Sequence, residues 1–132
     1  MRDDQVVRTF AERLCAVASG GDAEIRAALG VPATPPPLGA WQCEVTAGGL
    51  SRASVELKFS PPVITRGQLD SVLGEARSLP RTGPQAAHVI SYDVRVPGAP
   101  AMVTVFASFV ERPETAAKAK NILFRIDPPR AS

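Results

Sequence analysis

One histidine and two cysteines are the side chains of this sequence best suited to nucleophilic or metal chemistry. His88 is the only histidine, so a Ser-His-Asp or Cys-His site would have to be built around it. His88 begins a segment of alternating apolar residues, and Cys15 and Cys43 lie within apolar patterns where a thiol is normally inert. We therefore interpret all three as structural residues and predict no catalytic residue.

Motifs that bind metals or nucleotides are also missing from the sequence. It contains no Cys-x-x-Cys, no His-x-x-x-His and no clustered run of aspartates. The pair Gly20-Gly21 follows a predicted helix, whereas a phosphate-binding loop precedes one, and Gly48-Gly49 falls at a predicted hairpin turn. The sequence therefore predicts neither a metal site nor a cofactor.

Two glutamates, Glu44 and Glu56, fall on the outer face of two neighbouring predicted strands. A pair of carboxylates can act as general acid and base. On an exposed sheet, solvated glutamates neutralised by a neighbour such as Lys58 are the simpler interpretation. A small enzyme that uses carboxylates or His88 is kept as the second alternative function.

The spacing of apolar residues predicts helices in three segments. Two occupy residues 1–30, with acidic residues at their starts and glycines at their ends. The third begins at a capping box formed by Thr65 and Gln68, and its apolar stripe continues to Ala76 before Pro80 ends it. These helices would supply the layer that covers a sheet.

Alternation of apolar and polar residues predicts strands in most of the remaining chain, at 41–46, 53–59, 88–96, 101–110 and 122–127. A proline-rich connector over 31–40 precedes them, and 113–121 forms a short helix or an irregular connection. The order α-α-β-β-α-β-β-(α)-β predicts an α+β fold with a mainly antiparallel four- to five-stranded sheet and helices packed on one face. We predict a single domain over 1–132, with the sheet and third helix in 41–127 and a tail at 128–132.

Charge and composition exclude several classes of function. The net charge is +2 and no run of like charge occurs, which argues against a nucleic-acid partner. No segment approaches the roughly 20 apolar residues of a membrane helix, and no signal-peptide pattern is visible at the start. We expect the protein to be cytoplasmic, or exported after removal of a leader not present in this chain. The excess of Arg over Lys indicates a GC-rich gene and favours a bacterial source.

The even number of cysteines leaves a disulfide open. A bond between Cys15 and Cys43 would join the first helix to the first strand across a loop of about 27 residues, which stabilises by roughly 3 kcal/mol. Alternatively, the two cysteines are free thiols buried in the core of an intracellular protein.

The segment 101–110 is apolar at both alternating sets of positions, which predicts a central strand buried on both faces. The N-terminal helices could cover its second face; if they do not, that face would be an apolar patch of the kind that marks interfaces. Basic residues that could form the rim of such a surface are Lys58, Arg112, Lys118, Lys120 and Arg125.

The element order resembles that of small secretion-chaperone-like domains, which bind proteins through a sheet face, and that of many immunity and inhibitor proteins. The leading hypothesis is therefore a non-catalytic interaction module of the chaperone, immunity or inhibitor type. It would bind a partner protein or a second copy through a sheet face or edge. The first alternative is an exported, disulfide-stapled domain that binds a small ligand or an envelope component.

Overall fold

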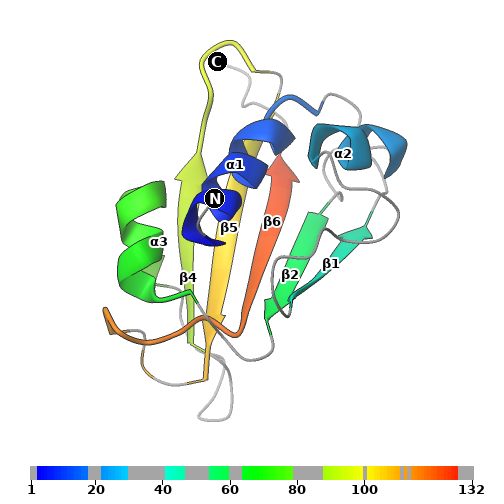
Figure 1. The fold of residues 1–132 in the computed structure, drawn as a ribbon. Coiled ribbons are helices and arrows are strands. Elements are labelled where there is room, and N and C mark those ends of the chain that lie inside the picture. Colours follow the sequence, from blue (N-terminus) through cyan, green and yellow to red (C-terminus); the bar gives the residue numbers. More distant parts are fainter. Residues whose placement is uncertain are drawn as a thin grey trace.

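Six strands form one antiparallel sheet, in the order β1-β2-β6-β5-β4-β3, in the computed structural model of the chain. Figure 1 shows β1, β2, β6, β5 and β4 side by side in this order. The structure describes residues 3–17, 22–29, 41–46, 54–59, 64–78, 88–99, 101–110, 112 and 114–127. The strands are β1 Trp41–Thr46, β2 Ser54–Phe59, β3 Arg77–Ser78, β4 His88–Val94, β5 Met102–Phe109 and β6 Asn121–Asp127. The helices are α1 Asp3–Leu14, α2 Asp22–Leu29 and α3 Arg66–Leu73.

The register of the strands aligns their apolar side chains in rows on one face of the sheet. Tyr92, Val105, Phe124 and Val55 are consecutive members of one such row across β4, β5, β6 and β2, and all four are fully buried. Phe10 of α1 approaches Phe124, with the two ring centroids 6.4 Å apart. Burial of each such side chain stabilises the fold by roughly 1.5–3 kcal/mol, so this row is the centre of the core.

The helices cover this same face, with α1 crossing in front of β5 and α3 beside β4 (Figure 1). α1 turns Val7, Phe10, Ala11 and Leu14 toward the core, and this spacing is that of one helical face. α2 contacts α1 and β1, and its Ile25 belongs to the same buried cluster. The α+β fold with an antiparallel sheet and helices on one face is therefore confirmed.

α3 begins as its capping box predicts. The Thr65 hydroxyl accepts a hydrogen bond from the Gln68 amide at 3.2 Å, and the Gln68 side chain accepts one from the Thr65 amide at 2.9 Å. The next two amides, of Arg66 and Gly67, donate to the carbonyls of Ala117 and Thr115 at 2.9 Å each. The start of the helix is thus fixed by its own cap and by the chain between β5 and β6.

α3 ends earlier than its apolar stripe indicates. It stops at Leu73, because Gly74 has φ +93°, a conformation that favours glycine and turns the chain out of the helix. Ala76 therefore lies outside the helix, and the chain continues into β3, a strand that was not predicted. The sheet has six strands for this reason, against the four or five expected.

α1 also ends earlier than predicted, at Leu14 and not at Gly20. The amides of Ala16 and Val17 bond three residues back, to Arg13 and Leu14, which tightens the last turn. The Cys15 carbonyl accepts from the Ala101 amide at 3.0 Å, which ties this turn to the start of β5.

Within the described residues, the connection between β5 and β6 is irregular, with a turn at 115–116 and an isolated bridge between Lys118 and Thr65. Of the two forms expected for 113–121, the irregular one is found. The proline-rich connector 31–40, the turn at Gly48-Gly49 and the tail 128–132 lie outside the described residues. No described helix is long and apolar enough to cross a membrane.

One hydrogen bond joins the centre of the sheet to α3. The hydroxyl of Tyr92, whose side chain is fully buried, donates to Asp70 Oδ1 at 2.6 Å. Burial first, and then the hydrogen bond to Asp70 and its negative charge, raise the pKa of Tyr92 above its ordinary value.

This bond predicts a loss of stability at alkaline pH. Because the pKa of Tyr92 is raised in the folded state, its contribution is complete below the unfolded pKa of about 10 and is lost as pH rises beyond it. Tyr92 is the only tyrosine of the chain, so tyrosinate absorbance reports it alone. We expect tyrosinate to form only together with unfolding, and Tyr92→Phe to cost about 1–2 kcal/mol at neutral pH. Reversible ionisation of the folded protein near pH 10 would contradict this.

Candidate functional site

The face of the sheet opposite α1 and α3 carries none of the described helices, and we call it the open face. It consists of alternate residues of the strands, and one row of it runs through Arg77 of β3, Ser91 of β4, Phe106 of β5, Leu123 of β6 and Glu56 of β2. The expectation that the N-terminal helices could cover the second face of 101–110 is wrong, because α1 and α2 belong to the core on the other face.

Apolar side chains occupy the middle of the open face. In β5, the alternate residues Val103, Val105, Ala107 and Phe109 are buried beneath the helices, as a central strand requires. The apolar residues of the open face are half-buried. They are Val89 of β4, Met102 and Phe106 of β5, and Leu123 of β6. The sheet therefore has a fully buried face and a second, partly exposed apolar one.

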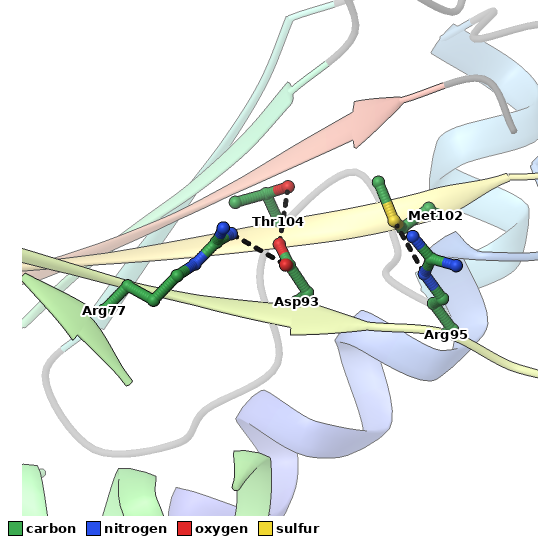
Figure 2. Close-up of polar contacts among 5 residues, drawn as sticks. All are labelled: Arg77, Asp93, Arg95, Met102 and Thr104. Carbon is green, nitrogen blue, oxygen red and sulfur yellow. Dashed lines mark hydrogen bonds and ion pairs between the residues drawn. The ribbon is translucent and has the colours of Figure 1, made fainter. Parts of the chain in front are cut away.

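An ion pair crosses this face from β3 to β4. The Arg77 guanidinium lies 2.7 Å from Asp93 Oδ2, and the Thr104 hydroxyl of β5 donates to Asp93 Oδ1 at 3.5 Å (Figure 2). The side chains of Arg77 and Asp93 are 64% and 40% exposed. Such an exposed pair contributes about 0–1 kcal/mol, so it can be rearranged at small cost.

Two further arginines contact apolar side chains of the open face. The Arg95 Nε donates to the Met102 sulfur at 3.1 Å (Figure 2). The guanidinium carbon of Arg125 lies 5.1 Å from the centroid of the Phe106 ring, a cation–π contact of roughly 0.5–1 kcal/mol. Arginine thus borders and partly covers the apolar centre, an arrangement typical of protein interfaces.

Acidic residues gather toward the other side of the open face. Glu44 of β1 and Glu56 of β2 occupy directly opposed positions in the register, and Asn121 of β6 donates to Glu56 Oε2 at 2.8 Å. Like charges in opposed positions destabilise a sheet. No group of three acidic, histidine or cysteine side chains able to hold a metal occurs within the described parts of the chain.

His88 and Cys15 lie at opposite ends of β4. His88 begins the strand opposite Phe109 and is half-buried, whereas the Cys15 thiol donates to the Val94 carbonyl at 3.5 Å. Six residues of strand, about 20 Å, separate these two positions. A Cys15–His88 pair is therefore not formed, and burial raises the pKa of the Cys15 thiol, which lowers its reactivity at neutral pH.

The five predicted basic residues do not form one group. Arg125 lies on the open face, and Lys58 holds a register position on β2 opposite Asn121. The other three, Arg112, Lys118 and Lys120, are exposed in the connection that leads from β5 to β6 and contacts the start of α3. The fold therefore does not bring these five residues together, and their joint role in binding stays a prediction.

Several residues of the open face were not singled out in the sequence. Asp93 and Arg95 were recognisable as outward positions of a predicted strand. Arg77 was not, because nothing in the sequence reveals a two-residue strand beside β4.

Comparisons with models of protein families, with curated proteins and with solved structures find no match to this chain.

The fold predicts the state of the cysteines. Cys15 is a free thiol against β4, whereas Cys43 lies on β1, four strands and about 19 Å away across the sheet. Disulfide-bonded residues have Cα atoms about 4.4–6.8 Å apart, so the proposed Cys15–Cys43 disulfide stays a prediction that this arrangement does not support. We expect two reactive thiols per chain in protein denatured without reductant after isolation from its native compartment. A count of zero would mean that the pair forms and that this packing of α1 is wrong.

Proposed function

We propose that this protein is a non-catalytic interaction module that binds a partner protein through the open face. The observation that carries the proposal is the apolar centre of this face, the opposed and half-buried pair Phe106 and Leu123, with the Arg125 guanidinium over the Phe106 ring and no described helix covering the pair. Apolar residues and arginines in this arrangement are enriched at protein interfaces, where they supply most of the binding energy.

The open face supports binding better than the strand edges do. At one edge, β3 contributes only two residues, Arg77 and Ser78, which is a short template for pairing with another strand. The face instead places Phe106 of β5 directly opposite Leu123 of β6, with Val89 of β4 diagonal to Phe106. Burial of such a patch stabilises a complex in proportion to the apolar area removed from water.

The open face also fits the interaction hypothesis better than an enzymatic one. The carboxylate pair Glu44 and Glu56 lies at the side of the face, and Glu56 is engaged by Asn121. His88 belongs to the strand phase of Ile90 and Tyr92, which is the phase buried beneath the helices. These positions do not converge on one point where a substrate could react.

A substitution in the apolar centre tests the proposal. We expect Leu123→Glu to reduce capture of the partner from extracts of the native cells at least tenfold, because it places a charge in the desolvated centre of the contact. Val89→Glu, near the border, should give a smaller loss. Capture is measured by quantitative mass spectrometry against a tagged wild-type bait.

The matched control is Arg112→Glu, an exposed change outside the open face, which should leave capture unaltered. Thermal unfolding of each variant establishes that it is folded. Undiminished capture by folded Leu123→Glu, or loss with Arg112→Glu alone, would contradict the assignment of the open face and place binding at the connection between β5 and β6.

A further inference from the structure

We propose that the partner bound at the open face is an acidic polypeptide segment that places a carboxylate on Arg95 and a bulky apolar side chain on Phe106 and Leu123. The inference rests on the proposed function and specifies the chemistry of the partner. It is carried by an exposed arginine that the described chain does not neutralise, and by the apolar pair on the same face.

Arg95 presents a positive charge whose described polar contact is to an uncharged group. The residue is exposed, and its Nε donates to the Met102 sulfur at 3.1 Å (Figure 2). A thioether sulfur is a weak acceptor. Among the described residues, no carboxylate forms an ion pair with this guanidinium. A carboxylate from a partner would make shorter and stronger hydrogen bonds to it, often two at once.

The acidic residue that precedes Arg95 on this face is already engaged. Asp93 lies two residues before Arg95, so both side chains belong to the open face. Asp93 Oδ2 lies 2.7 Å from the Arg77 guanidinium, and Oδ1 accepts from the Thr104 hydroxyl at 3.5 Å (Figure 2). Because Arg77 balances Asp93, Arg95 adds a net positive charge to the group of side chains that Figure 2 draws.

The apolar pair lies farther along the same strand. Phe106 follows Met102 by four residues of β5, about 13 Å, and Leu123 of β6 lies directly opposite Phe106. Arg125 occupies the position opposite Thr104, between these two residues of β5, and its guanidinium carbon lies 5.1 Å from the centroid of the Phe106 ring. The apolar pair is therefore bordered by positive charge on the side that faces Arg95, and the partner's acidic residue belongs on that side.

The charges of the face favour an acidic polypeptide over a polyanion such as a nucleic acid. A nucleic acid is held by many cations that follow its phosphates. Here the arginines share the face with Asp93 and with Glu56, which accepts a hydrogen bond from Asn121 at 2.8 Å. A row of phosphates would meet these carboxylates, whereas single carboxylates beside an apolar side chain need only the arginines.

Selection from a random peptide library displayed on phage, with the full chain as target, tests the inference. We expect the enriched peptides to combine Asp or Glu with a bulky apolar residue. A selected peptide should bind Arg95→Glu about tenfold or more weakly than the wild type, because like charges then meet. Arg95→Gln, which removes the charge without reversing it, should give a smaller loss, and Leu123→Glu should also weaken binding. The matched control, Arg112→Glu, makes the same charge change outside the open face and should leave the affinity unaltered.

No enrichment, enriched peptides without an excess of acidic residues, or peptides whose binding is indifferent to Arg95→Glu would each overturn the inference. Thermal unfolding establishes that each variant is folded. A wild type that forms a dimer in light scattering, dissociated by Leu123→Glu but not by Arg95→Glu, would overturn it in favour of a second copy. These results are separable from failure of the proposed function, because capture from extracts that still depends on Leu123 would leave the open face as the binding surface and remove only the acidic partner.

Discussion

The structure depends on one constraint, the register that brings apolar residues of four strands into common rows. Since side chains alternate along a strand, a slip of one residue between β5 and β6 would move Phe124 from the core to the open face. The contacts of α1 and α3 follow from this register, because Phe10 packs on Phe124 and Asp70 accepts the hydrogen bond of Tyr92. The helices therefore stabilise the strand register in addition to covering one face of the sheet.

The same register determines what the open face presents. Once Val103, Val105 and Phe109 are committed to the core, Met102, Thr104 and Phe106 must lie on the other side of β5. Thr104 and Ser91 are almost fully buried there, although no described helix covers them. The apolar centre and the arginines over it are thus consequences of strand pairing, and they supply the surface to which we assign binding.

The sequence predicted the elements whose pattern is long enough to be periodic. Three helices, five of the six strands and the capping box at Thr65 were recognisable, because each depends on residues close together in the chain. β3 was missed because two residues carry no alternation, and the end of α3 because the conformation of Gly74 outweighs an apolar stripe. The pairing of Arg77 with Asp93 depends on strand order, which no local pattern contains. Strand order also explains why the five basic residues predicted to bind do not lie together: some are on the sheet, and the others are in the connection after β5.

The central claim is that the open face is free in the isolated chain and becomes covered on binding. Methyl NMR with a soluble paramagnetic probe tests it most directly, because Met102 and Leu123 lie on the open face whereas Ile122 and Ile126 are fully buried beneath the helices. At low protein concentration, the account predicts strong broadening of the Met102 and Leu123 methyls and none of the two isoleucines. Broadening should fade as a captured partner is added. Met102 and Leu123 methyls as protected as those of Ile122 at every dilution would show that the chain covers this face itself, and would contradict the account.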